Sequence, residues 1–239
     1  MPITTQWLPY QDGPVPLRGF LAQNPDRSVR GGLLLVHGGA GLDQHAMTQA
    51  QRYAGLGLTV LACDMFGPGV AGDRDRIIAQ LREMQQDPAL VRRRAEAGLQ
   101  ALRSLPDIAA KAAGAVGFCF GGMVVLTLAR QGADLAGVVS MHGSLRTTRP
   151  AQPGAVRARV LVCHGARDLH VPLRDVTALI EEMDRSGADL QLIVYSSAMH
   201  GFTHAGAVPG ATPGVAYDEP TDRRSFEAAT RFLDELFRR

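Results

Sequence analysis

The sequence predicts an α/β fold, with a mostly parallel central sheet and helices on both of its faces. Short apolar runs of strand length recur along the chain, and segments of helical length separate them. This alternation implies right-handed crossovers between parallel strands. The runs at 33–36 (Leu-Leu-Leu-Val) and 160–162 (Val-Leu-Val) are apolar without interruption. Such runs are typical of strands that are buried on both sides of a sheet.

In chain order, the apolar runs place strands near residues 17–22, 32–37, 58–63, 114–118, 136–140, 158–163 and 190–195. The intervening segments place helices near residues 43–56, 74–86, 88–104, 121–131, 172–186 and 222–237. Pro88 marks a break between two helices, because proline is tolerated in the first turn of a helix but not in its interior. Two long connections rich in proline and glycine, 143–157 and 204–222, are candidate covers of an active site or else surface excursions.

Composition describes an ordinary globular protein, and we expect residues 1–239 to form one domain. The chain is 46% hydrophobic and 20% charged, with a net charge of +2. This charge gives no reason to expect nucleic acid as a partner, and no apolar run is long enough to span a bilayer. The oligomeric state is left open. Three cysteines without metal-ligand spacing, and an N-terminus without the pattern of a signal peptide, predict a reducing, cytoplasmic location.

The most informative stretch is Gly117-Phe-Cys-Phe-Gly-Gly122, which follows an apolar run and opens a helical one. Glycines two residues before and after Cys119 leave room for a tight turn that presents the thiol, as in a nucleophile elbow with Cys in place of Ser. At the start of a helix, the unsatisfied backbone N–H groups favour a thiolate and an adjacent oxyanion. The alternative is a buried Cys in an ordinary strand-to-helix turn.

Two further segments favour the elbow. The strand near 158–163 leads into Asp168, and the strand near 190–195 leads into His200. Open α/β sheets gather their functional loops at the carboxyl ends of their strands. The order along the chain is therefore nucleophile, acid and base, which is the order of the α/β-hydrolases. The sequence thus predicts an α/β-hydrolase fold with Cys119, Asp168 and His200 as catalytic residues.

These segments resemble the dienelactone hydrolase family, a branch of the α/β-hydrolases with a Cys nucleophile. The resemblance extends from about residue 17 to the C-terminus. It rests on Gly117–Gly122, His-Gly-Ala-Arg-Asp at 164–168, Met-His-Gly-Phe at 199–202, His-Gly-Gly-Ala-Gly-Leu at 37–42 and Ala-Cys-Asp-Met-Phe-Gly at 62–67. It implies a carboxymethylenebutenolidase-like hydrolase of small esters or lactones that needs no cofactor and forms a thioester intermediate.

In the implied mechanism, Cys119 attacks the carbonyl, His200 acts as base and then as acid, and Asp168 orients its ring. Backbone N–H groups of Phe120 and Gly39 are the expected donors of the oxyanion hole. His142, Phe202 and His204 are candidate substrate-binding residues, since they follow the 136–140 strand or lie next to His200.

The sequence departs from the family at two places. Many members have a Glu directly before the oxyanion donor, where this chain has Gly38, so activation of the thiol is left to His200. Two arginines that hold a substrate carboxylate in the founding type are not clearly matched: His204 stands at one position, and Arg74 and Arg76 are only loosely placed near the other. Dienelactone is therefore not assumed to be the substrate.

Other functions compete with this interpretation. A thioesterase or acyltransferase would use the same three residues. A non-catalytic α/β-hydrolase-fold protein that binds a small ligand would be expected to lack one of them, yet all three are present. A redox thiol protein lacks a resolving cysteine nearby in the sequence. No metal site is expected, because no His pair has the i, i+4 spacing on a helix.

Overall fold

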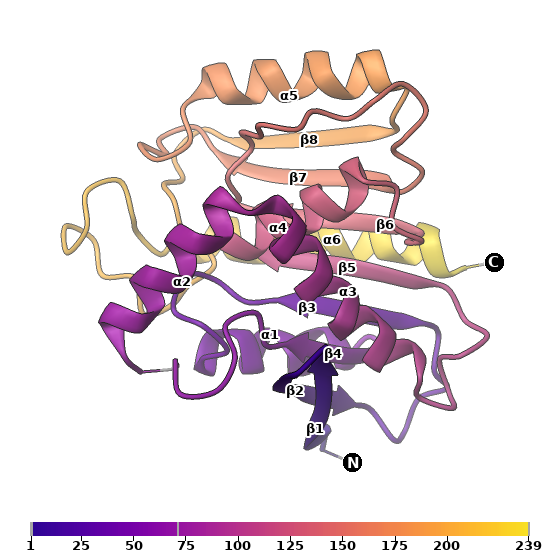
Figure 1. The fold of residues 1–239 in the computed structure, drawn as a ribbon. Helices are drawn as coiled ribbons and strands as arrows, with labels where there is room; N and C mark the ends of the chain where they lie inside the picture. The colour runs from indigo at the N-terminus through magenta and orange to yellow at the C-terminus, as the bar shows by residue number, and fades with distance from the viewer. Residues whose placement is uncertain (1, 71, 239) are drawn as a thin grey trace. The chain divides into compact units, whose positions relative to one another are not determined.

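The computed structural model describes residues 2–70 and 72–238 and divides into two compact units, Met1–Ala115 with Phe237–Arg239 and Val116–Leu236. Strands and helices alternate along most of the chain (Figure 1). The strands are β1 (Thr4–Asp12), β2 (Val15–Gln23), β3 (Gly32–Val36), β4 (Thr59–Cys63), β5 (Ala113–Phe118), β6 (Gly137–Met141), β7 (Arg159–Gly165) and β8 (Leu190–Tyr195). The helices are α1 (Gln44–Ala54), α2 (Arg74–Gln86), α3 (Pro88–Arg103), α4 (Phe120–Arg130), α5 (Leu173–Ser186) and α6 (Glu219–Phe237).

In the first unit, the strands lie in the order β1, β2, β4, β3. β3 and β4 pair in parallel and are buried along their whole length, which the uninterrupted apolar run at 33–36 predicts for β3. β2 pairs antiparallel with both β4 and β1. Sequence analysis missed β1, whose residues are mostly exposed and include Pro9, a residue that is rare inside strands. The Asp12-Gly13 dipeptide at the hairpin turn, with Gly13 at φ +56°, was the signal that could have found it.

Helix boundaries in this unit follow from capping. The Asp43 carboxylate accepts a hydrogen bond from the Ala46 N–H at the start of α1. Asp87 caps α3, and Pro88 occupies its first turn, so the predicted break between α2 and α3 is confirmed. Both α1 and α3 pack against the β3–β4 pair.

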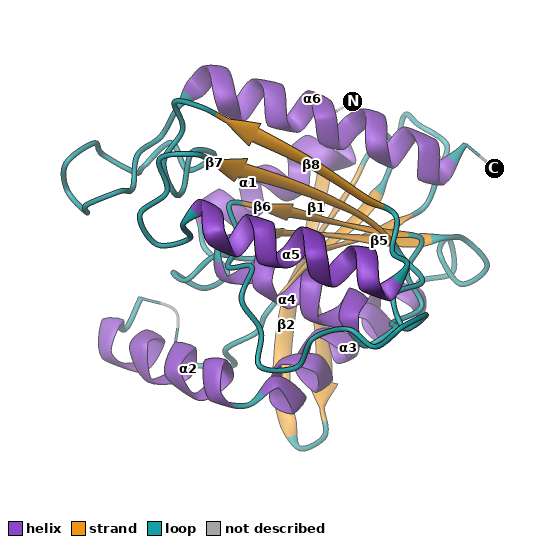
Figure 2. Cartoon of the chain, turned by 90° about the horizontal axis from the view of Figure 1, so that it is seen from above, coloured by secondary structure: helices purple, strands orange, loops and turns teal. Residues whose placement is uncertain are grey.

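In the second unit, β6 pairs in parallel with β7, and β7 with β8. Figure 2 shows α4 and α5 on one face of these strands and α6 on the other. Gly137 of β6 lets α6 approach closely, since a Cβ there would lie 2.5 Å from Leu236 and 3.1 Å from Phe232. The predicted α/β fold is confirmed. The strands β6, β7 and β8 of the second unit are parallel, whereas in the first unit β1 and β2 add antiparallel pairings to the parallel β3–β4 pair. The single-domain assignment stays a prediction.

The connection 143–157, expected as a candidate cover, is fastened to α4 and α5. Glu182 of α5 accepts a hydrogen bond from the Ala151 N–H at 2.8 Å, and Arg130 of α4 donates one to the Leu145 carbonyl at 2.8 Å. The Gly154 N–H donates to the carbonyl of Ser186. These hydrogen bonds tie the connection to α4 and α5, and its role as a cover stays a prediction.

Candidate active site

Cys119 stands on a strained turn between β5 and α4. Its backbone has φ +52° and ψ −112°, a conformation that costs energy in any residue with a Cβ. A Cβ at Gly117 would collide with the Gly121 carbonyl, and one at Gly122 would lie 2.6 Å from the Gly143 Cα. The glycines on either side are thus required by close backbone approach, and the turn has the geometry that the elbow sequence predicts.

The structure joins Cys119, His200 and Asp168 in one series of hydrogen bonds. His200 Nε2 lies 3.0 Å from the Cys119 Sγ, and His200 Nδ1 lies 2.8 Å from the Asp168 Oδ2. The other oxygen of Asp168 accepts the backbone N–H groups of His170 at 2.8 Å and Val171 at 2.9 Å. The carboxylate is therefore fixed on both sides, which sets the orientation of the His200 ring.

The surroundings of His200 favour its protonated ring. Burial opposes the imidazolium of His200, but the hydrogen bonds and negative charges of Asp168 and Cys119 outweigh it and raise the pKa of His200 to about 10. Burial likewise works against the ionised Asp168, yet its contact with His200 and the two backbone N–H groups lower the pKa of this carboxyl below its ordinary value. The ring is thus protonated at neutral pH when the sulfur is a thiolate.

The backbone of His200 is held by the segment that precedes α6. The His200 N–H donates to the Gly214 carbonyl at 2.9 Å, and the Ala216 N–H donates to the His200 carbonyl at 3.1 Å. The Asp218 N–H donates to the Phe202 carbonyl at 3.1 Å. Part of the second candidate cover, 204–222, therefore supports the position of His200 directly.

Two of the three candidate substrate-binding residues, His142 and Phe202, are buried near His200. His142, at φ +41°, is 2% exposed, and its ring centroid lies 5.4 Å from that of His200. Phe202 has no exposed surface and packs edge-on against His142 at 4.8 Å. Both side chains are covered by their neighbours, and their predicted contact with a substrate stays a prediction. His204 is half-buried in a turn where its Nδ1 accepts the Gly206 N–H, and its role stays a prediction.

Two residues near His200 were missed by sequence analysis. The Thr203 hydroxyl lies 2.8 Å from the His142 Nε2, a contact between residues 61 positions apart for which the sequence carries no signal. The His170 ring lies 5.3 Å from the His200 ring, and its Nε2 lies 3.1 Å from the Pro213 carbonyl. The position of His170, two residues after Asp168, was a signal that could have been followed.

The two expected oxyanion donors lie in different units. Phe120 is the first residue of α4, where backbone N–H groups lack partners within the helix. Gly39 lies in the loop between β3 and α1. His37 orders the start of that loop: it donates from Nδ1 to the Gly38 carbonyl at 2.7 Å and accepts the Met65 N–H on Nε2 at 3.1 Å. Burial lowers the pKa of His37, which suits this neutral, structural role.

Cys63 and Cys163 are buried, and burial raises the pKa of the Cys163 thiol to about 12 and that of Cys63 further still. Within residues 2–70 and 72–238, no group of three or more His, Cys, Asp or Glu side chains is arranged to hold a metal ion. None of the helices in this described part combines the length and hydropathy needed to cross a bilayer.

An α/β fold with a nucleophile on a strand-to-helix turn, followed along the chain by an acid and a base, defines the class of α/β-hydrolases. The family model of the dienelactone hydrolase family matches residues 17–237. The chain therefore belongs to the dienelactone hydrolase family, as the sequence motifs predict, and is a hydrolase.

Solved structures agree with this assignment. A protein named m3DLH is 34% identical with a TM-score of 0.93, and the match covers 99% of this chain and 100% of that one. A dienelactone hydrolase-like promiscuous phosphotriesterase from metagenomic libraries is also 34% identical over 99% of this chain and 100% of its own, with a TM-score of 0.92. The dienelactone hydrolase of Anabaena variabilis, 20% identical over 99% of this chain and 98% of its own, shares the fold with a TM-score of 0.70.

A curated relative shows the same kinship over a shorter stretch. An uncharacterized protein of Caenorhabditis elegans is 37% identical over 146 residues, which make up 60% of this chain and 92% of that protein.

Proposed function

We propose that this protein hydrolyses small esters or lactones with Cys119 as nucleophile, His200 as general base and acid, and Asp168 as the residue that orients His200. One observation carries the proposal. The Cys119 sulfur, the His200 ring and the Asp168 carboxylate form a continuous series with separations of 3.0 and 2.8 Å. A nucleophile, a base and an orienting acid within hydrogen-bond reach are the signature of acyl transfer through a covalent intermediate.

The first half of the reaction makes a thioester. The thiolate of Cys119, paired with the imidazolium of His200, attacks the carbonyl carbon. The oxyanion that forms is held by the backbone N–H group of Phe120 at the start of α4, because a donor placed where charge develops stabilises the transition state. The intermediate then collapses and breaks the carbon–oxygen bond of the ester. His200 gives its proton to the leaving oxygen, which becomes the alcohol or the hydroxyl of the opened lactone.

The second half releases the acid. Neutral His200 takes a proton from a water molecule as that water attacks the thioester carbon. Collapse of this second intermediate breaks the carbon–sulfur bond, frees the carboxylic acid and restores the pair of thiolate and imidazolium. Asp168 keeps the proton of His200 on Nδ1 throughout, so that Nε2 faces the reacting atoms. General acid–base catalysis of this kind contributes roughly 10²- to 10⁴-fold in rate.

The direct contact between Cys119 and His200 supports activation of the thiol without the Glu that many family members carry. Gly38 stands at that position. The Nε2 to Sγ separation of 3.0 Å lets His200 take the thiol proton itself, and the raised pKa of His200, about 10, favours its keeping that proton. We propose that the enzyme works on a small molecule as a single catalytic domain in the reducing cytoplasm, where the thiol stays free.

Phosphotriester hydrolysis is a second candidate activity, favoured by the similarity to the dienelactone hydrolase-like promiscuous phosphotriesterase. The same steps apply with phosphorus in place of the carbonyl carbon. Cys119 displaces an aryl alcohol to form a phosphorylated sulfur, and water then releases a phosphodiester. A good leaving group makes this reaction accessible without further groups in the site.

A substrate panel with two cysteine variants tests both activities. The substrates are p-nitrophenyl acetate and butyrate, dienelactone, an acyl-CoA and a p-nitrophenyl dialkyl phosphate. We expect turnover to vanish in Cys119→Ala and to persist in Cys163→Ala, the matched control, because the Cys163 side chain is buried within β7. The phosphate arm decides the second candidate, since absence of Cys119-dependent turnover of that substrate rejects it.

Three outcomes would contradict the proposal. Equal turnover by the native protein and Cys119→Ala would remove Cys119 from the mechanism. Absence of turnover on every substrate would favour the non-catalytic ligand-binding alternative. A strong preference for the acyl-CoA over both simple esters and dienelactone would favour a thioesterase or acyltransferase with the same three residues.

A further inference from the structure

A hollow in the first unit has the size of a small-molecule site. It has a volume of about 500 Å³ and is lined from the β1–β2 hairpin and from the segments that follow β3 and β4. Binding sites for small molecules measure roughly 300–1,000 Å³ and combine apolar walls with a few polar groups. The lining residues that matter to its chemistry are Trp7, Leu17, Arg18, Leu42, Asp64 and Phe66. None of these residues belongs to the proposed catalytic series.

The hairpin supplies an aromatic wall with a cation beside it. In the register of β1 and β2, Trp7 lies opposite Phe20, and Arg18 is the diagonal neighbour of Trp7 on the same face. The Arg18 guanidinium carbon lies 4.3 Å from the centre of a Trp7 ring. Trp7 is 42% exposed, which is unusual for so large an apolar side chain. Stacking on an indole holds a guanidinium in place and leaves its edge N–H groups for an anion.

Two charged side chains line the hollow, Asp64 and Arg18, and they differ in the contacts that they already make. The Oδ1 of Asp64 accepts the backbone N–H groups of Phe66 at 2.9 Å and Gly67 at 3.0 Å. In the described part of the chain, no carboxylate forms an ion pair with Arg18. Arg18 is therefore the charged group in this hollow that can pair with an anion from outside.

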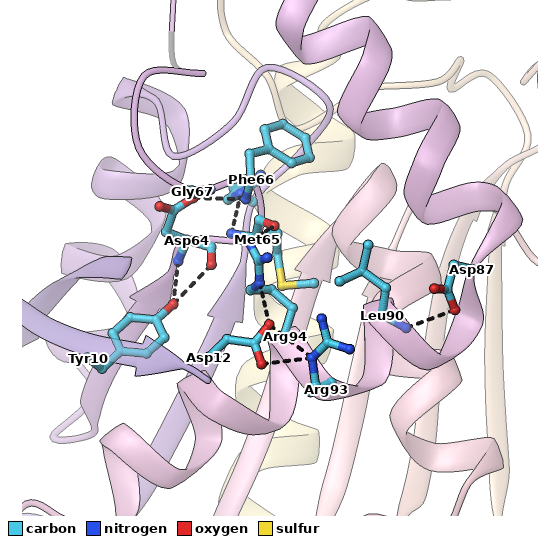
Figure 3. Close-up of polar contacts among 11 residues, drawn as sticks. Tyr10, Asp12, Asp64, Met65, Phe66, Gly67, Asp87, Leu90, Arg93 and Arg94 are labelled. Carbon is cyan, nitrogen blue, oxygen red and sulfur yellow. Dashed lines mark hydrogen bonds and ion pairs between the residues drawn. The ribbon is translucent and has the colours of Figure 1, made fainter. Parts of the chain in front are cut away.

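The opposite wall is held rigid by buried polar contacts, which Figure 3 shows. The Tyr10 hydroxyl donates to the Asp64 carbonyl at 3.0 Å and accepts the Asp64 N–H at 2.9 Å. Arg94, paired with Asp12 at 2.9 Å, donates to the Met65 carbonyl at 3.1 Å. These contacts fix the segment that carries Phe66 before any ligand arrives, and a wall formed in advance lowers the entropic cost of binding.

We propose that this hollow binds a planar aromatic carboxylate of one or two rings. Its ring lies between the aromatic and aliphatic walls that Trp7, Phe66, Leu17 and Leu42 provide, and its carboxylate pairs with the Arg18 guanidinium. Concavity together with a single available cation favours a small anion over a second copy of the chain, which would need a broad complementary surface. This binding goes beyond the proposed hydrolysis and does not depend on it.

Intrinsic fluorescence tests the proposal directly, because Trp7 is the only tryptophan of the chain. The probe is phenylacetate, titrated at low ionic strength with excitation at 295 nm. The matched probes are phenylacetamide, which has the ring without the charge, and acetate, which has the charge without the ring. We expect a saturable change in Trp7 emission with phenylacetate, and binding weaker by roughly tenfold or more with either matched probe.

Two arginine variants locate the binding. Arg18→Gln is expected to weaken phenylacetate binding by roughly tenfold or more. Arg27→Gln is expected to leave it unchanged, because Arg27 is exposed in the turn after β2 and does not line the hollow. Circular dichroism of both variants verifies that each is folded.

Absence of a saturable change would overturn the proposal, and so would equal binding of the amide or of Arg18→Gln. Light scattering that shows a dimer in the native protein and a monomer in Arg18→Gln would assign this face to a second copy instead. None of these readouts involves turnover, so failure here leaves the hydrolase proposal untouched, and failure of the hydrolase proposal leaves this one untouched.

Discussion

Replacing Arg130 by methionine should remove one half of a buried ion pair that fastens the 143–157 connection. Arg130 donates to both carboxylate oxygens of Glu182 at 2.9 Å and to the Leu145 carbonyl at 2.8 Å. The two side chains are only 2% and 8% exposed. In Arg130→Met, Glu182 keeps the Ala151 N–H but loses its counter-charge. Breaking a buried pair from one side costs about 3–5 kcal/mol of the free energy of unfolding.

Urea unfolding measures this cost. With a slope of about 2–3 kcal/mol per molar urea, the midpoint should fall by about 1–2.5 M. The matched control is Arg92→Met, which removes an exposed pair with Glu96 on α3 and should change the free energy of unfolding by no more than about 0.5 kcal/mol. The double variant Arg130→Met/Glu182→Leu should recover most of the loss, because it leaves no buried charge.

Two results would refute this reasoning. If Arg130→Met were no less stable than Arg92→Met, the buried carboxylate of Glu182 would not need its partner. If the double variant were less stable than Arg130→Met, the penalty would come from lost packing and not from an uncompensated charge.

The remaining predictions concern the proposed active site. Asp168→Asn should lower kcat by up to about 10⁴-fold while the far-ultraviolet circular dichroism stays native, because an amide no longer selects the His200 tautomer; kcat within a few-fold of native would contradict this. The pKa of His200, about 10 against an ordinary 6.5, should fall in Cys119→Ala, because this variant lacks the sulfur that raises it. Proton NMR titration of the histidines measures this pKa. An unchanged value would argue against the interaction between His200 and Cys119. Because the folded pKa of His200 is raised, its contribution to stability should be complete below pH 6.5 and be lost as the pH rises through about 10, which thermal unfolding across this window checks. Gly122→Ala should lower the free energy of unfolding by about 1–3 kcal/mol and reduce kcat, because its Cβ meets the Gly143 backbone and pushes the start of α4 away. Thermal unfolding and initial rates measure the two effects. A variant with native stability would show that this contact relaxes without cost.

The sequence predicted most of the fold because the responsible signals are local. Uninterrupted apolar runs located β3 and β7, and Pro88 located the break between α2 and α3. β1 was not predicted, because an exposed edge strand buries little surface and shows no clear apolar pattern. Its pairing with β2 is decided by the hairpin.

By itself, the sequence determined the family, the class of fold and the three residues proposed for catalysis. These predictions rest on short segments of the sequence: the glycine spacing around Cys119, and the positions of Asp168 and His200 after strands. Each of these signals can be recognised without knowing how the rest of the chain folds. Only the tertiary structure decided what surrounds them. It placed Phe202 in the core, paired Thr203 with His142, and fastened His200 to Gly214. Such contacts depend on how separate strands and loops pack together in three dimensions, which side-chain type and local spacing do not specify.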